Sequence, residues 1–482
     1  MSPSSVFATL IAAIGGLLLP FDVLNAEDPK VPASQPISME FVEISPGEFQ
    51  MGSPEDEPDR RENETPHKVR LTKAFKIGKC EVTQAQFETV MGFNPSLFED
   101  EEHSGLPVEQ VSWFDAVMFC NRLSEKEGRV PIYQFRDLKR NGDSIRYANV
   151  KVVAGNGYRL PTDAEWEYSC RAGTTTAYLA GATIGAEQAE FGENLRHTEN
   201  VDKYAPNPWG LHNMQGNVSE WCWDFEATVP SEVAIDPTGP FAGETRLFRG
   251  GNWYLGSPCF RSAFHMGLSP GWASRTIGFR VVLGEQDADP SASAFADADH
   301  ELFELAPHIS QNPPKFNAKT TREVATDRIQ STIQLLAKLD KTHADNPVVE
   351  MRLGDAYRMA YILDIEDACE SSEIYLKKAI EHDPDSFYYQ SHTLLGTLYC
   401  QSDAKRVNEA VGHFERAIEI AGDFAIDAYR GLVFAYIIQG NPRKALQAAE
   451  DCLKIDADID DVQALRAALR ASLKNESPDP DR

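Results

Sequence analysis

The sequence lacks several of the patterns that assign a function directly. It has eight cysteines but no C-x-x-C pair and no Cys/His cluster with zinc-ligand spacing. It has no G-x-S-x-G elbow, and no glycine-rich loop that ends in Gly-Lys-Ser/Thr. The sequence signatures of zinc fingers, dithiol redox enzymes, α/β-hydrolases and P-loop nucleotide-binding proteins are therefore absent.

Positive charge is also scarce. Lys and Arg total 46 against 74 Asp and Glu, which gives a net charge of -28. Binding to a phosphate backbone needs a basic face, so this balance argues against a nucleic-acid partner and disfavours an anionic membrane surface. A hydrophobic content of 42% and a charged content of 25% are ordinary for globular proteins. The length of 482 residues predicts two or three domains.

A long apolar run occurs near the N-terminus, from Val6 to about Leu24, and is followed by Ala26 and an acidic stretch. This pattern predicts a signal peptide over residues 1–26 and an exported bacterial protein, periplasmic or secreted. No Lys or Arg precedes the run, and Leu24 is larger than the residue usual at that distance from a cleavage site. An uncleaved N-terminal anchor, which would attach the protein to a membrane, therefore stays open as the alternative.

Residues 39–283 form a block rich in Gly, Trp, Asn and Pro, with short strand-like pieces. Helical stretches follow Thr83, Ser112 and Thr162. Ser112 and Thr162 are good N-cap residues, and Glu165 lies three places after Thr162, as in a capping box. We expect an α+β domain with much irregular structure.

Two further blocks follow. Residues 284–320 are small, acidic and proline-containing, which predicts a flexible acidic linker. Residues 321–475 have helical periodicity, and residues 476–482 are expected to be a disordered tail.

A degenerate repeat lies within the helical block, at about 350–458. One copy of its pattern is Leu395-Gly396-x-x-Tyr399 followed by Ala410-x-x-x-Phe414. This pattern resembles tetratricopeptide repeats, with an unrelated helical bundle as the alternative. The resemblance implies an all-α solenoid that binds a protein or peptide partner.

Seven stretches in the first block, spanning about 40–283, resemble the formylglycine-generating enzyme, or sulfatase-modifying factor, family. They are ISPGEFQMGS, EVTQAQF, LPVEQVSWFDAVMFCNRLSE, YRLPTDAEWEYSCRAG, NPWGLHNMQGNVSEWCWD, FRGGNWY and TIGFRVV. The resemblance implies an α+β fold related to C-type lectins, usually stabilised by calcium. Active family members oxidise a sulfatase cysteine to formylglycine, using oxygen and a copper ion held by two cysteine thiolates.

The resemblance places only one of the two copper-binding cysteines in this chain. The family pair follows a Gly-Gly-Ser stretch and is separated by four residues. Cys259 occupies the second position, whereas the first falls near Tyr254 or Leu255 and Asn252 replaces the serine. A single thiolate should hold the soft Cu(I) ion poorly, so copper is not an expected cofactor. Cys222 is the thiol that the fold could instead bring to Cys259.

The resemblance also implies a substrate cleft and several other roles. Asn252, Trp253, Tyr254 and Arg261 would line the cleft, although a tryptophan is more often a core residue. Cys120 and Cys170 match positions that are disulfide-bonded in some members, but their expected partners are absent here. We therefore expect both to be free and buried.

Two calcium sites are implied by the resemblance. One would use Asn194 and Asp202 with the carbonyls of Leu195 and Tyr204. The other would use Asn217 and Glu220 with the carbonyl of Val218 or a neighbour. Mixed carboxylate, amide and carbonyl oxygens suit Ca²⁺, although Asn and Asp also cap turns without any ion.

These observations predict an exported family member without copper-dependent oxidase activity, acting as a protein- or peptide-binding or assembly module. Two alternatives stay open. One is an active oxidase that matures sulfatases recruited by the repeats, with Cys259 as a catalytic residue. The other is a different chemistry in the same cleft, because a fold alone does not determine function.

Overall fold

The computed structural model describes residues 37–98, 105–185, 197–226, 233–310, 313–383, 389–422, 425–457 and 459–476. The predicted signal peptide lies outside these residues, as does almost all of the predicted C-terminal tail. The chain divides into two compact units at Ala296/Asp297. In the described part of the chain, no helix combines the length and the apolar character needed to cross a membrane.

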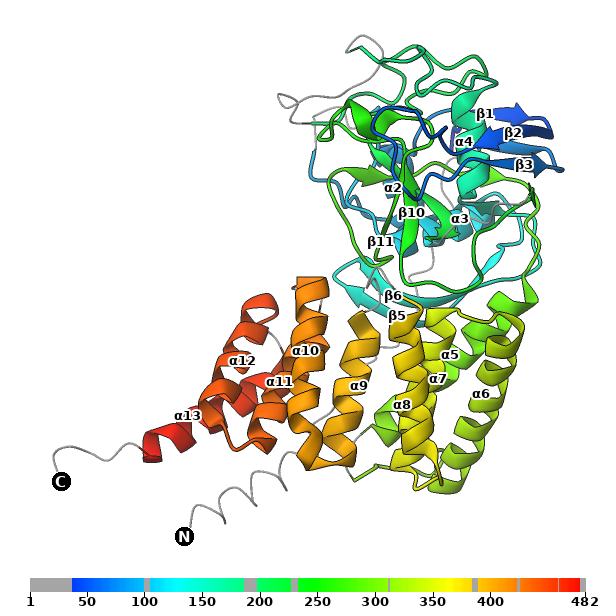
Figure 1. Cartoon of the computed structure of the whole chain (residues 1–482). Helices are drawn as coiled ribbons and strands as arrows, with labels where there is room; N and C mark the ends of the chain where they lie inside the picture. Colours follow the sequence, from blue (N-terminus) through cyan, green and yellow to red (C-terminus); the bar gives the residue numbers. More distant parts are fainter. Residues whose placement is uncertain are drawn as a thin grey trace. The chain divides into compact units, whose positions relative to one another are not determined.

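Small β-sheets form the framework of the N-terminal unit (Figure 1). The strand orders are β1-β4-β13-β7, β11-β10-β8-β12 and β2-β3-β9, with β5-β6 as a hairpin. The strands are β1 (Phe41–Ile44), β2 (Gly47–Met51), β3 (His67–Leu71), β4 (Phe75–Gly78), β5 (Tyr133–Asn141), β6 (Ser144–Val152), β7 (Tyr158–Arg159), β8 (Ser219–Phe225), β9 (Ala234–Ile235), β10 (Arg246–Arg249), β11 (His265–Leu268), β12 (Ile277–Gly278) and β13 (Val282–Leu283). Strands far apart in the sequence pair directly, as β4 does with β13, so the unit closes on itself.

Three capped helices pack on these sheets. They are α2 (Gln84–Met91), α3 (Trp113–Lys126) and α4 (Asp163–Arg171). Thr83, Ser112 and Thr162 each accept a hydrogen bond from the backbone N–H three residues later and form a capping box. The predicted helix starts are therefore confirmed, because side-chain oxygens satisfy N–H groups that a helix end leaves free.

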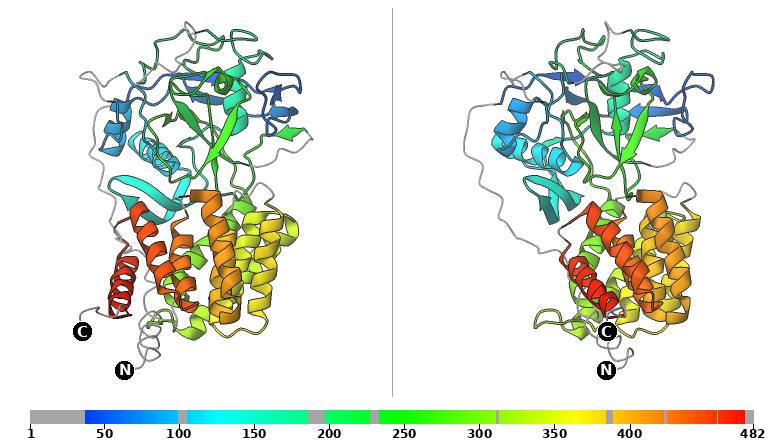
Figure 2. Two further views of the ribbon diagram at one scale, coloured as in Figure 1. Left: turned by 60° about the vertical axis from the view of Figure 1, so that its left-hand side comes forward. Right: turned by 90° about the vertical axis from the view of Figure 1, so that its left-hand side faces the viewer.

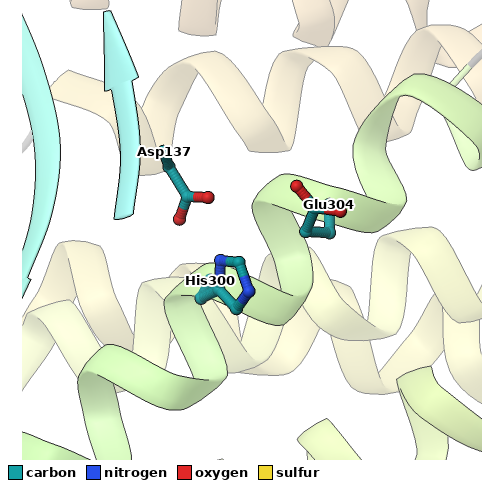
Figure 3. Close-up of side chains that lie close together, drawn as sticks. All are labelled: Asp137, His300 and Glu304. Atoms are coloured by element: carbon teal, nitrogen blue, oxygen red, sulfur yellow. The ribbon is translucent and has the colours of Figure 1, made fainter. Parts of the chain in front are cut away.

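The segment predicted as a flexible linker is largely helical, so that prediction is wrong. Helix α5 spans Pro290–Ile309, and its residues His300 and Glu304 lie one turn apart (Figure 3). Leu302, Leu305 and Ile309 are buried. Their helical spacing gives α5 an apolar stripe that packing can stabilise, although the small and acidic residues around it are typical of linkers.

The C-terminal unit continues with helices that pack mainly on their sequence neighbours (Figures 1 and 2). These are α6 (Arg322–Thr342), α7 (Pro347–Ile362), α8 (Ala368–Glu381), α9 (Tyr389–Ser402), α10 (Val407–Ala421), α11 (Ile426–Ile438), α12 (Pro442–Ile455) and α13 (Asp460–Glu476), with a short 3-10 turn, η2 (Ala404–Arg406). The pairs α7–α8, α9–α10 and α11–α12 share the most contacts, as expected for stacked helical hairpins.

The glycine and bulky positions of the predicted repeat meet one another. A Cβ on Gly354 would lie 2.6 Å from Leu376 Cγ, and one on Gly396 would lie 2.9 Å from the Phe414 ring. Gly431 on the next helix faces the same ring. Paired helices approach closely where one of them has a glycine, whose side chain is a single hydrogen atom. This is the packing that the repeat pattern predicts.

Candidate functional site around Cys259

Cys259 lies in a short 3-10 turn, η1 (Ser257–Phe260), that follows the pair Gly250-Gly251. Both glycines have left-handed backbone angles, with φ of 94° and 66°, which glycine adopts without strain. A Cβ on Gly251 would lie 2.8 Å from the Cys259 carbonyl oxygen. The turn that carries Cys259 can therefore pack on this loop only because residue 251 has no side chain.

Neither Cys259 nor Cys222 is in an environment that favours a thiolate. Cys259 is half-buried, and burial raises the pKa of its thiol despite the nearby Arg61 and Arg261. Cys222 is fully buried on β8, where burial raises its thiol pKa well above the usual range. Its Sγ lies 3.9 Å from the Glu220 carbonyl oxygen. Because Cu(I) binds the deprotonated thiolate, both environments disfavour the copper pair.

Cys120 and Cys170 are free and buried, as predicted. Burial raises the pKa of the Cys170 thiol to about 12. Its Sγ lies 3.7 Å from Ser262 Oγ and 3.7 Å from the Met214 carbonyl oxygen. Both cysteines are core residues rather than reactive thiols.

Tyr254 is the large exposed side chain in the segment after the glycine pair, where Gly256 is also exposed. Tyr254 and Leu255 are the two positions near which the first thiolate was expected, and Tyr254 is 65% exposed. Trp253 is only 2% exposed; its Nε1–H donates to the Arg275 carbonyl at 3.2 Å, and its ring meets Phe98 edge-on. Asn252 is buried and accepts the Tyr254 N–H at 3.1 Å. The Tyr254 ring is therefore accessible to a partner.

Arg261, predicted to line the cleft, is instead buried in an ion-pair clamp. Its guanidinium donates to both Glu64 oxygens at 2.6 and 2.7 Å, to Glu57 at 2.9 Å and to the Asp59 carbonyl at 2.7 Å. Burial alone would raise the pKa of Glu64, but hydrogen bonds from Arg261 and Ser53 lower it overall. Arg261 therefore holds the loop before β3 against η1.

Glu109 is a buried acid next to this region that the sequence did not identify. Its Oε1 accepts the N–H groups of Leu97 and Phe98 at 2.5 and 2.8 Å. Its Oε2 accepts no hydrogen bond from any residue that the structure describes. Burial raises the pKa of Glu109 to about 7, against the effect of these N–H groups and of Arg275. Glu109 thus fixes the backbone of the segment whose Phe98 packs on Trp253.

The first predicted calcium site is only half described. Asn194 and Leu195 lie outside the described residues. Asp202 is exposed, and the Tyr204 carbonyl accepts a hydrogen bond from His212 Nδ1 at 2.8 Å.

All three residues of the second predicted calcium site, Asn217, Val218 and Glu220, are buried at the start of β8. The Glu220 carboxylate makes two contacts of 2.6 Å with Arg280 and accepts the Trp166 Nε1–H at 2.8 Å. Both of its oxygens are therefore engaged, and a cation bound through them would compete with Arg280.

A second buried acid, Glu81, lies against the same loop and was missed by the sequence analysis. Its oxygens accept Nδ2–H groups of Asn213 at 3.2 Å and Asn217 at 3.0 Å. Burial raises the pKa of Glu81, Arg280 opposes this, and Glu220 raises the pKa further. Ionisation of both acids beside one guanidinium would leave a surplus negative charge in a buried place, which is costly, so Glu81 favours its protonated form. Carboxylate oxygens are ligands that Ca²⁺ prefers, so the two acids suit this ion, whereas Asn213 and Asn217 turn their Nδ2–H groups towards Glu81.

Comparisons with known proteins find a family match over the N-terminal unit. The family model described as a sulfatase-modifying factor enzyme 1-like domain matches residues 27–284. The chain belongs to the sulfatase-modifying factor family. Family membership confirms the predicted formylglycine-generating-enzyme fold for the N-terminal unit, and the C-terminal helical stack agrees with the predicted tetratricopeptide-like solenoid.

Three proteins similar to this member of the sulfatase-modifying factor family have different names. It is 36% identical to the chaperone protein LppX of Paenibacillus barcinonensis, over 37% of the chain and 69% of the relative. It is 30% identical to the formylglycine-generating enzyme of Streptomyces coelicolor, over 55% of the chain and 95% of the relative. The solved structure of Treponema denticola variable protein 1 has 30% identity and a TM-score of 0.45, and covers 51% of this chain and 95% of that one.

Proposed function

We propose that the N-terminal unit is a non-oxidising member of the sulfatase-modifying factor family that binds a protein or peptide. The observation that carries this proposal is the lack of the first copper-binding cysteine, expected near Tyr254 or Leu255, where the exposed Tyr254 lies. The remaining thiol, Cys259, has a raised pKa, and Cys222 is buried in the core. A site without an activated thiolate pair lacks the means to hold Cu(I) or to pass electrons from it.

Calcium is proposed as a structural ion of this unit. The two buried carboxyl groups of Glu81 and Glu220, which both interact with Arg280, support an ion there. Bound Ca²⁺ would offset the buried charge and fix the loop, whose Asn217 carbonyl accepts the Trp253 N–H at 2.9 Å. The ion would therefore stabilise the segment that carries Tyr254.

The helical unit is proposed to bind a protein partner, and the whole protein to be exported. Stacked helical hairpins present a concave surface to extended peptides or partner proteins. The apolar N-terminal run supports export. Two binding modules on one chain can hold two partners, or one partner at two points, and so raise the effective local concentration.

The alternative is an active oxidase, which the similarity to formylglycine-generating enzymes favours. The deciding experiment is mass spectrometry of a Cys-x-Pro-x-Arg peptide incubated with the whole protein, Cu(I), a thiol reductant, oxygen and calcium. We expect the peptide to stay unchanged while a positive-control formylglycine-generating enzyme converts it to the aldehyde.

A Cys259→Ser variant makes the result specific to this site. Conversion by the wild-type protein that is lost in Cys259→Ser would refute the binding-module proposal and would establish an oxidase. Conversion that persists in the variant would point to contamination by another enzyme. Tryptophan fluorescence reports whether both proteins are folded.

A further inference from the structure

Three ionisable side chains converge at one end of the first helical hairpins in the C-terminal unit. Asp345 lies in the turn between α6 and α7, Glu350 in α7, and His382 at the C-terminal end of α8. His382 Nδ1 lies 2.8 Å from Glu350 Oε2, and its Nε2 lies 3.5 Å from Asp345 Oδ1. One ligand atom from each of the three lies within 4.8 Å of the others. The imidazole is thus held between two carboxylates.

The hydrogen bond with Glu350 determines which ring nitrogen of His382 carries the proton. An ionised carboxylate only accepts, so Nδ1 must donate its N–H to Glu350. The neutral ring then has a lone pair on Nε2, which faces the Asp345 oxygen. Two acceptors repel each other, so a second proton on Nε2, or a metal ion shared by Nε2 and the carboxylate, would stabilise this contact.

We propose that His382 Nε2 and Asp345 form a binding site for a zinc-like divalent transition-metal ion, with Glu350 as the positioning residue. Zinc–ligand bonds of about 2.0–2.1 Å in tetrahedral geometry put two ligands roughly 3.3 Å apart. The observed separation of 3.5 Å therefore matches two ligands of one ion. A histidine that binds metal through one nitrogen commonly donates its other N–H to a carboxylate, as His382 does to Glu350.

Burial and charge around the three residues favour this assignment. The Glu350 side chain is 2% exposed, which fixes the ring, whereas that of Asp345 is 75% exposed, which leaves room for water ligands. Asp340 and Glu381 add negative charge near the site, and Lys378 adds one positive charge. A bound divalent ion would tie the α6–α7 turn to the end of α8.

The test is isothermal titration calorimetry of the whole protein with Zn²⁺ at pH 7.5, in two buffers of different ionisation enthalpy. The wild-type protein should bind one zinc more than either Asp345→Asn or His382→Gln. Glu350→Gln should keep the stoichiometry but bind about 10–100-fold more weakly, as expected for a residue that orients a ligand. Proton release on binding should fall in His382→Gln, because the metal no longer displaces the proton of this imidazole.

Two features of the chain keep the test clear. Asp345 has a left-handed φ of 65°, which asparagine also tolerates, so Asp345→Asn should fold even if His382→Gln does not. The matched control is Asp364→Asn, which changes another acid in a helix-connecting turn, paired with Arg322 and not with a histidine. The control should bind zinc like the wild type.

Equal zinc stoichiometry and affinity in the wild type, Asp345→Asn and His382→Gln would overturn the proposal. In that case, His382 would be a protonated bridge between the two carboxylates. An NMR titration would then show an imidazole pKa that falls in Asp345→Asn.

Discussion

Replacing Glu109 by glutamine should change how the stability of the N-terminal unit depends on pH. The pKa of Glu109 is about 7 in the folded protein against an ordinary value of 4.5, because burial disfavours the charged form. The folded state holds this proton more tightly than the unfolded chain does. The protonated Glu109 carboxyl therefore makes its whole contribution to the free energy of unfolding below about pH 4.5, and this contribution is lost as the pH rises through 7. At 1.36 kcal/mol per pK unit, this loss is about 3 kcal/mol between pH 4 and pH 8.

Glutamine stays neutral over this range, and its carbonyl oxygen can still accept the N–H groups of Leu97 and Phe98. The Glu109→Gln variant should therefore lose less stability than the wild type as the pH rises, by roughly 2–3 kcal/mol between pH 5 and pH 8. The absolute stability at one pH is a poorer measure, because the new amide group also lacks a partner for its N–H bonds.

Urea unfolding followed by tryptophan fluorescence provides the assay. All seven tryptophans lie between residues 113 and 272, so their emission reports the N-terminal unit. Glu125→Gln, on an exposed position of α3, is the control and should follow the wild-type pH dependence. If the Glu109→Gln and wild-type curves run parallel from pH 5 to pH 8, the argument that burial raises this pKa is wrong.

Three other predictions concern copper, calcium and the repeats. Tyr254→Cys restores the family spacing to Cys259, and the variant should form a Cu(I) complex with a thiolate charge-transfer absorption that the wild type lacks. If the variant does not bind copper, the chain lacks more than one of the residues that copper binding needs. The melting temperature of the wild type should be higher in calcium than in a chelator, and this rise should be smaller for the Glu81→Gln variant. An equal rise in both proteins would exclude Glu81 from the site. Phe414→Ala should cost about 3–5 kcal/mol in the helical unit, measured by far-ultraviolet circular dichroism during urea unfolding; a loss below about 1 kcal/mol would contradict the packing of this ring on Gly396.

Local features of the fold were predictable from the sequence, and long-range ones were not. The caps at Ser112 and Thr162 depend on residues three places apart, so the sequence displays them directly. The family motifs identified the N-terminal fold for the same reason. Helix α5 was missed although Leu302, Leu305 and Ile309 have helical spacing in the sequence, because the small and acidic residues around them dominate the composition of the segment and are typical of linkers.

The features of the candidate site also fall into those that the sequence shows and those that only the structure shows. The absence of a second cysteine near Cys259 is a fact of the sequence, and it already argued against copper. The role of Arg261 was not visible, because its partner Glu64 lies 197 residues earlier in the chain. Glu109 and Glu81 give only a weak signal, an acid next to a buried valine in PVEQV and CEVT, and the sequence does not state which charges surround them.

The sequence by itself determined the family, the capped helices, the repeat pattern and the missing thiol, since each depends on residue identity at short spacing. Only the tertiary structure decided that Tyr254 is exposed while Trp253 is buried, that Arg261 is held in a clamp, and that His382 lies between two carboxylates. These properties depend on which distant segments meet and on how much water their contact excludes. Burial and neighbouring charge then set the chemistry of each side chain.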